Sequence, residues 1–175
     1  MSRFVIVTDG VTPLNVRTDP GTNHPLVASM SRLPVGDEFS SREVRNVGSG
    51  SSRQRWHRVG TNRWVCEFSL NGNSRNCLEI QSGWTIRTPN GDQSSSTRFR
   101  VINVPASGLN VRSAPIVTGL KGGNWVMSLA NNTNHNWSGQ GAVDPNQPSQ
   151  STSRVWIRMR SGRWVVAHHV CAPTG

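Results

Sequence analysis

The side chains that could carry out covalent chemistry are few in this sequence. Cys66 is a nucleophile candidate, with His57 as the base that would activate it. A catalytic thiol needs a base within hydrogen-bond reach, and it needs access to its substrate. However, Cys66 follows Trp64-Val65 in an expected strand, and the matching position in the second half of the chain is Val166. We therefore expect Cys66 to be a buried core thiol.

The remaining candidates for metal or cofactor chemistry lack the required spacing. Cys66, Cys77 and Cys171 do not have metal-site spacing, and His168-His169 in a strand would point to opposite faces. The few acidic residues form no glycosidase-type pair, and the sequence has no phosphate loop or serine elbow. We expect a protein that is not an enzyme and needs no metal or cofactor. Free buried thiols are expected, with a Cys66–Cys77 disulfide as the alternative in an exported protein.

Ligand binding by aromatic stacking has more candidates, because the chain contains 7 Trp residues. Trp137 lies in the polar sequence NHNWSG beside His135 and Asn136, where no apolar periodicity requires an aromatic side chain. An aromatic ring flanked by amides suits a carbohydrate, because the ring supplies area and the amides bind hydroxyls. The alternative is that Trp137 anchors its loop on its own domain. Trp125 is a further ligand candidate, because the other half of the chain has no Trp at the matching position.

Two Trp–Arg pairs complete the binding candidates. Period-two alternation in RVWIRMR (154–160) places the apolar residues on one face and Trp156 with Arg158 on the other. Trp56 and Arg58 stand at the same positions in the first half. We expect these pairs to be exposed on the strand face. An exposed Trp–Arg stack is worth about 0.5–1 kcal/mol, so the pair can serve structure alone, but it also suits a sugar ring or a nucleobase.

These candidates belong to a sequence that repeats itself. Residues 4–20 match residues 99–115 at a constant offset of 95, and both contain LNVR. Residues 56–65 (WHRVGTNRWV) match residues 156–165 (WIRMRSGRWV) at an offset of 100. Two blocks that recur in the same order indicate a duplicated unit.

Strand and turn signals dominate both copies, and no segment shows the pattern of an amphipathic helix. The sequence predicts a first domain over 1–71, a connector over 72–97 and a second domain over 98–175. Within the connector, residues 78–88 suggest two short strands around Ser82-Gly83. The change of offset indicates a longer middle loop in the second copy. This segment, 131–153, is rich in Asn, Gln and Ser, and we expect an exposed loop there.

The charge of the chain points to an acidic partner. The formal net charge is +10, and 18 of the 19 basic residues are Arg. Residues 96–175 carry 8 bases and 1 acid, which gives a net charge of +7. A basic surface of this kind is typical of proteins that bind nucleic acid, anionic cell-wall polymers or acidic proteins.

The order of LNVR, a Ser/Pro loop, a glycine-led strand and a late W-x-x-V…W-V hairpin resembles the bacterial Src-homology-3 (SH3b-type) domain family. The matching residues of the hairpin are Trp56, Val59, Trp64 and Val65 in the first copy, and Trp156, Met159, Trp164 and Val165 in the second. The resemblance implies an all-β fold of two small Src-homology-3-like β-barrels in tandem. It also implies accessory modules that bind the peptides or the glycan of the bacterial cell wall.

We therefore expect a non-catalytic binding protein that recognises peptidoglycan or another glycan. The alternatives are a nucleic-acid-binding protein that uses its Arg and Trp faces, and a protein-interaction or inhibitor protein. The sequence has no apolar run long enough for a membrane span, and its start, MSRFVIVTDG, lacks the features of a signal peptide. These features suggest either a cytosolic protein or the mature form of a secreted one.

Overall fold

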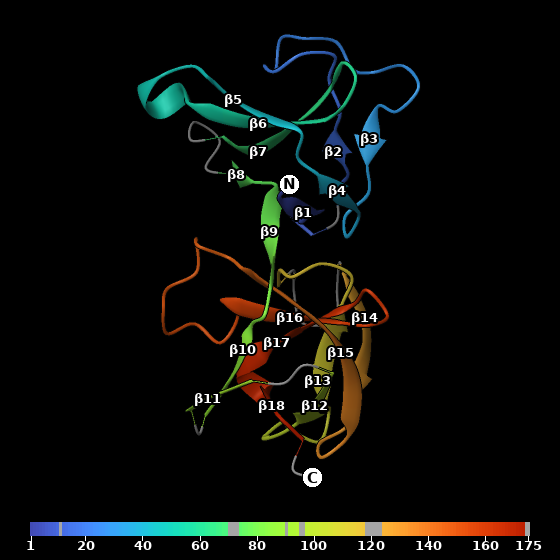
Figure 1. Ribbon diagram of the computed structural model, residues 1–175, viewed down its shortest axis with the longest axis vertical. Helices are drawn as coiled ribbons and strands as arrows, with labels where there is room; N and C mark the ends of the chain where they lie inside the picture. The colour runs from blue at the N-terminus through green and yellow to red at the C-terminus, as the bar shows by residue number, and fades with distance from the viewer. Residues whose placement is uncertain (11, 70–73, 90, 95–96, 118–123, 174–175) are drawn as a thin grey trace. The chain divides into compact units, whose positions relative to one another are not determined.

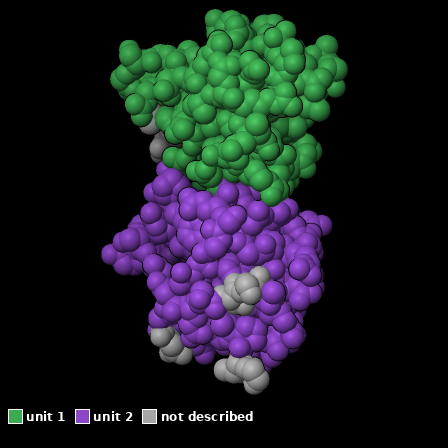
Figure 2. Space-filling model, in the orientation of Figure 1, with its two compact units in different colours: residues 1–79 green, residues 80–175 purple. Residues whose placement is uncertain are grey.

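The computed structural model describes residues 1–10, 12–69, 74–89, 91–94, 97–117 and 124–173 (Figure 1). The described part is all-β, as predicted, and its only helical segments are two short 3-10 turns, η1 (Gly50–Ser52) and η2 (Ala167–His169). Neither turn has the length and apolar character of a membrane-spanning helix. The chain forms two compact units, residues 1–79 and 80–175 (Figure 2). The domain boundary expected at residues 71 and 72 lies outside the described residues, and the expected connector is divided between the two units.

Unit 1 is built from short strands joined by turns. Its main sheet has the order β5-β6-β7-β8, β2 pairs with β3, and β1 lies between β4 and β9. The strands are β1 (Arg3–Ile6), β2 (Leu14–Asn15), β3 (Arg32–Leu33), β4 (Glu38–Ser40), β5 (Glu43–Val47), β6 (Gln54–Gly60), β7 (Arg63–Ser69), β8 (Ser74–Arg75) and β9 (Cys77–Ser82). Strand β9 begins in unit 1 and ends in unit 2.

The two faces of the β6–β7 hairpin bury different residues. Successive side chains of a strand point to opposite faces, so Trp56 and His57 cannot share one. On one face Val65 joins the apolar core of unit 1, whose other buried members are Phe4, Ile6, Leu14, Val16, Phe39 and Cys77. On the other face Trp56, Trp64 and Cys66 form a separate buried cluster, against which Val47 packs.

Unit 2 has a longer sheet of the order β14-β13-β17-β16-β15, and the end of β9 pairs with β15. Strand β12 pairs with both β15 and β18, while β10 and β11 form a separate hairpin (Figure 1). The strands are β10 (Thr85–Thr88), β11 (Gly91–Ser94), β12 (Arg98–Val101), β13 (Leu109–Arg112), β14 (Trp125–Leu129), β15 (Asn134–Val143), β16 (Val155–Met159), β17 (Trp164–Val166) and β18 (Val170–Cys171).

The core of unit 2 confirms the alternation predicted for β16. Ile157 is fully buried in this core, and Val155 and Met159 pack against it from the same face of the strand. The strands β9 and β10 also confirm the two short strands expected around Ser82-Gly83.

Matching residues of the two copies occupy matching places in the strand pairing. The last residue of LNVR faces the second Trp of the hairpin in both units, as Arg17 opposite Trp64 and as Arg112 opposite Trp164. Both hairpins also turn through a residue with positive φ, Asn62 (50°) and Gly162 (83°), and such turns favour Asn and Gly. The sequence repeat is therefore also a repeat of strand pairing.

The expectation of an exposed loop over residues 131–153 is wrong for residues 134–143, which form the ten-residue strand β15. Their polar composition has a low intrinsic preference for strands, but the backbone of β15 pairs with β9, β12 and β16. Strand preference depends strongly on such neighbours, and here the pairing prevails over composition. Residues 144–154 connect β15 to β16, and the predicted loop includes 144–153 of this connection.

Candidate functional site

The structure places Trp137 inside unit 2. Its side chain is 2% exposed and belongs to the core that contains Phe99 and Ile157. The indole Nε1 donates a hydrogen bond of 3.0 Å to the carbonyl of Gln140. Trp137 therefore acts as an anchor, which is the structural alternative considered for it, and its ring is not presented to a ligand.

The two residues beside Trp137 do not join it in a site. Asn136 is exposed, while His135 is half-buried with its ring 5.6 Å from that of Phe99. Burial lowers the pKa of His135 below its ordinary value, and the ring nitrogen Nε2 lies 2.8 Å from the hydroxyl of Thr133. Trp125 is half-buried on β14, at the other end of the strand order from β15.

The expectation that Trp56 and Trp156 are exposed is wrong, because these side chains are 2% and 1% exposed. Both indoles are satisfied within the protein: Trp56 donates to the side-chain oxygen of Gln54 at 3.0 Å, and Trp156 donates to the carbonyl of Ser153 at 2.7 Å. Period-two alternation identifies the two faces of a strand, but it does not say that one of them meets solvent. In both units the second face of the hairpin is covered as well.

The arginines paired with these Trp residues are also held within their units. Arg58 forms an ion pair of 2.9 Å with Glu43, and Arg158 donates a hydrogen bond of 3.1 Å to the side-chain oxygen of Gln140. In unit 1, Arg58 lines a pocket of about 370 Å³ together with Trp64. The guanidinium of Arg45 covers the ring of Trp64 at 4.9 Å, so the cation–π contact in this pocket is made within the protein.

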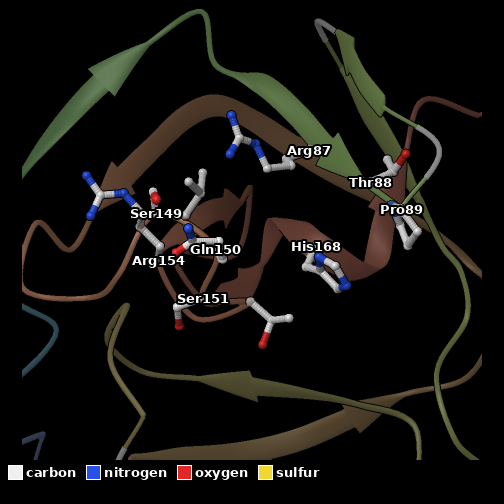
Figure 3. Close-up of a pocket in the computed structure, with 10 residues that line it drawn as sticks. Arg87, Thr88, Pro89, Ser149, Gln150, Ser151, Arg154 and His168 are labelled. Atoms are coloured by element: carbon white, nitrogen blue, oxygen red, sulfur yellow. The ribbon is translucent and has the colours of Figure 1, made fainter.

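Unit 2 has a pocket of about 260 Å³ that none of the predicted ligand residues lines (Figure 3). Strand β10 and the residue after it form one wall, the connection between β15 and β16 forms another, and η2 contributes His168. The lining residues are Arg87, Thr88, Pro89, Ser149, Gln150, Ser151, Thr152, Arg154, Val155 and His168.

The lining of this pocket includes two arginines and several hydroxyl side chains, and none of its lining residues carries a carboxylate. Arg154 donates to the backbone carbonyls of Gln147 and Asp144, which hold its guanidinium in place without cancelling its charge. Arg87 is half-exposed and pairs at 3.2 Å with Asp92, which lies outside the lining. Figure 3 shows both guanidinium groups beside the pocket, with His168 across from Arg154. The arrangement can bind a hydroxylated anion.

The sequence contains only an indirect signal for this pocket. Its residues come from three segments, 87–89, 149–155 and 168, that are far apart in the chain. The basic second half pointed to an anionic ligand, and the insertion pointed to a region that is specific to the second copy. Nothing in the sequence shows that Arg87 and Arg154 line the same pocket.

The structure also places the Cys and His residues that were considered for covalent and metal chemistry. Cys66 is 8% exposed, and burial raises its pKa to about 12, so it is a core thiol as expected. Cys66, Cys77 and Cys171 are all free thiols. His168 and His169 lie in η2 with their rings 4.9 Å apart, not in a strand as expected. Among the described residues no group of three His, Cys, Asp or Glu side chains has the arrangement of a metal site.

Comparisons of this chain with protein-family models, with curated proteins and with solved structures give no match.

Proposed function

We propose that this protein is a binding protein made of two bacterial Src-homology-3-like modules, and that unit 2 binds an anionic glycan of the bacterial cell wall. The observation that carries the proposal is the pocket of about 260 Å³ whose lining combines Arg87 and Arg154 with hydroxyl and amide side chains and no carboxylate. The sequence resemblance supports the cell wall as the source of the ligand. The proposed module fold rests on that resemblance and on the repeated strand pairing.

The chemistry of the lining fits a sugar that carries a negative charge. Hydroxyl and amide groups exchange hydrogen bonds with sugar hydroxyls, while a guanidinium binds a carboxylate through charge-assisted hydrogen bonds. Peptidoglycan offers both kinds of group. The volume lies just below the range of about 300–1,000 Å³ that is usual for ligand pockets, so one residue of a polymer is the expected occupant.

Binding of nucleic acid, the first alternative, keeps the basic charge that motivated it but loses the Trp rings on which bases would stack. Single strands are bound by aromatic side chains on which bases stack, together with a positively charged groove. Trp56, Trp137 and Trp156 are buried and offer no ring for stacking. The net charge of +7 over residues 96–175 still favours an anionic ligand, but a small pocket lined by two arginines and hydroxyl groups suits a sugar acid better than a stacked base.

The proposal is tested by sedimentation with purified peptidoglycan and by calorimetry with its soluble fragments. The test variant is Arg87→Gln with Thr152→Ala, because both side chains are exposed in the pocket lining. The matched control is Arg160→Gln, which removes the same charge from an exposed position of unit 2 outside the pocket. We expect the double variant to bind about tenfold more weakly, since a hydrogen bond to a charged group contributes roughly 1.5–3 kcal/mol and these side chains are partly solvated.

Two results would overturn the proposal. One is that the folded wild type binds neither peptidoglycan nor its fragments. The other is that Arg160→Gln weakens binding as much as the double variant does, which would mean that overall charge and not the pocket holds the ligand. Oligonucleotides measured at two salt concentrations serve as the comparison, because binding to nucleic acid falls steeply with salt.

A further inference from the structure

Unit 1 contains three side chains linked in a hydrogen-bonded line. The hydroxyl oxygen of Ser41 lies 2.8 Å from Nδ1 of His57, and Nε2 of the same ring lies 2.8 Å from Oε2 of Glu67. Ser41 lies between β4 and β5, His57 on β6 and Glu67 on β7. A nucleophile, a base and a carboxylate that orients the base in this order form the arrangement used for nucleophilic catalysis.

The charges around Glu67 fix the direction of these hydrogen bonds. Burial opposes the ionisation of Glu67, but the hydrogen bond from His57 and the positive charges of Arg55 and Arg75 outweigh it and lower its pKa. Both arginines lie 3.2 Å from the carboxylate. An ionised carboxylate only accepts hydrogen bonds, so Nε2 of His57 donates to it. In the neutral imidazole, the lone pair of Nδ1 is then left to accept the proton of Ser41.

Packing holds the imidazole in this orientation. His57 is 0% exposed, and its ring centroid lies 4.3 Å from that of Phe4 and 5.9 Å from that of Phe39. The hydroxyl of Ser41 has one other acceptor, the carbonyl of Glu43, at the longer distance of 3.4 Å. The contact with His57 is therefore the shorter of the two.

Ser41, the first of these three side chains, lies at a surface pocket. Ser41 is half-buried and lines a pocket of about 230 Å³, which is also lined by His57, Arg42 and Arg55. A pocket of this size has room for a short acyl group beside the hydroxyl. The lining also includes the carboxylates of Glu43 and Glu79, and Arg55 is paired with Glu67 at 3.2 Å.

The fold itself does not require polar residues at these positions. At the offset of 100 that relates the two hairpins, His57 corresponds to Ile157, and Glu67 on β7 falls at Ala167, which lies in η2; both residues of unit 2 are 0% exposed in its core. Replacing buried ionic groups by apolar residues is often neutral or stabilising. The polar pair in unit 1 is therefore poorly explained by stability alone.

We propose that Ser41 is a catalytic nucleophile and that unit 1 hydrolyses esters of short acyl groups, a function beyond the glycan binding assigned to unit 2. The Ser41 oxygen attacks the carbonyl carbon and its proton passes to Nδ1 of His57. Collapse of the tetrahedral species breaks the ester C–O bond, and the leaving alcohol takes the proton from His57. Water then attacks the acyl-enzyme by the same proton route, which releases the carboxylic acid and restores Ser41.

The test uses a fluorophosphonate probe with mass spectrometry of the whole chain, and hydrolysis of p-nitrophenyl acetate. We expect one label, on Ser41, and turnover that Ser41→Ala abolishes. The matched control is Ser40→Ala, because Ser40 is an exposed serine at the neighbouring position and outside the pocket lining. His57→Gln should lower both signals by about 10²-fold or more, since a positioned base contributes roughly 10²–10⁴-fold.

Glu67 is a positioning residue, and its substitution separates positioning from folding. Glu67→Gln should lower kcat and leave KM unchanged in protein that circular dichroism shows to be folded. The proposal is overturned if folded wild type is not labelled at Ser41, or if Ser41→Ala retains its turnover. Peptidoglycan binding by the Ser41→Ala variant is measured in parallel. If Ser41→Ala still binds peptidoglycan, the loss of hydrolysis in this variant is separate from glycan binding, and either proposal can fail without the other.

Discussion

Replacing Trp137 by alanine distinguishes a core anchor from a ligand platform. The side chain is 2% exposed, and its indole nitrogen donates to the carbonyl of Gln140 at 3.0 Å. Truncation of a buried Trp to Ala costs about 3–5 kcal/mol, because apolar contacts are lost and a cavity remains. A domain has a total stability of about 5–15 kcal/mol. We therefore expect Trp137→Ala to remove a large share of the stability of unit 2.

Two further variants make this expectation quantitative. Trp137→Phe retains most of the apolar area but loses the hydrogen bond to Gln140, so we expect a loss of roughly 1–2 kcal/mol. Trp125→Ala is the matched control, because Trp125 is a half-buried Trp in the same unit. Its truncation should cost less than that of Trp137.

The assay is urea unfolding followed by circular dichroism, combined with peptidoglycan binding in the absence of denaturant. We expect Trp137→Ala to unfold at a lower urea concentration and, while folded, to bind as the wild type does. The reasoning is refuted if Trp137→Ala keeps its stability to within about 1 kcal/mol and loses binding. That result would mean that the ring contacts the ligand.

Two other perturbations test the packing of the units. Because folding lowers the pKa of Glu67, its ionisation stabilises unit 1 above the ordinary Glu pKa of about 4.3, and this contribution is lost as the pH falls through the folded pKa. The wild type should therefore lose stability in acid, and Glu67→Gln should show a shallower dependence in thermal melts between pH 7 and pH 3; equal slopes would contradict the assignment. In unit 2, a Cβ on Gly141 would lie 2.4 Å from Cδ1 of Trp84, so Gly141→Ala should destabilise the unit by about 1–3 kcal/mol, the usual cost of overpacking. An unchanged urea midpoint would show that Trp84 moves aside freely.

The all-β class and the duplication could be predicted because both depend on local patterns. Alternation of apolar residues in 154–160 identified the core face of β16, and the turn residues marked the hairpins. The exposure of Trp156 could not be predicted in the same way, since it depends on what covers the second face of the strand. The same limit applies to Trp137, whose polar neighbours suggested a loop although β15 pairs with three other strands.

The candidate sites were harder to predict than the fold. From the sequence, His57 was considered only as a base for Cys66. Cys66 and Glu67 are adjacent on β7 and so point to opposite faces, and His57 contacts Glu67. The nucleophile candidate that the structure provides, Ser41, comes from a turn between two strands. A serine in a turn has no pattern that distinguishes it from the other serines of the chain.

Both proposed sites lie where the two copies of the unit differ. The β15–β16 connection, residues 144–154, supplies one wall of the glycan pocket, while the corresponding β5–β6 connection in unit 1 spans only residues 48–53. The hydrogen-bonded side chains of Ser41, His57 and Glu67 depend on the polar residues His57 and Glu67 of unit 1. Unit 2 has Ile157 and Ala167 at the corresponding sequence positions. The shared strand pairing fixes the scaffold in both copies, so a change in one copy need not disturb the other. Duplication thus lets one chain carry the proposed glycan pocket in unit 2 and the proposed nucleophile Ser41 in unit 1, and the strand pairing of the repeated hairpins is the scaffold that both proposals share.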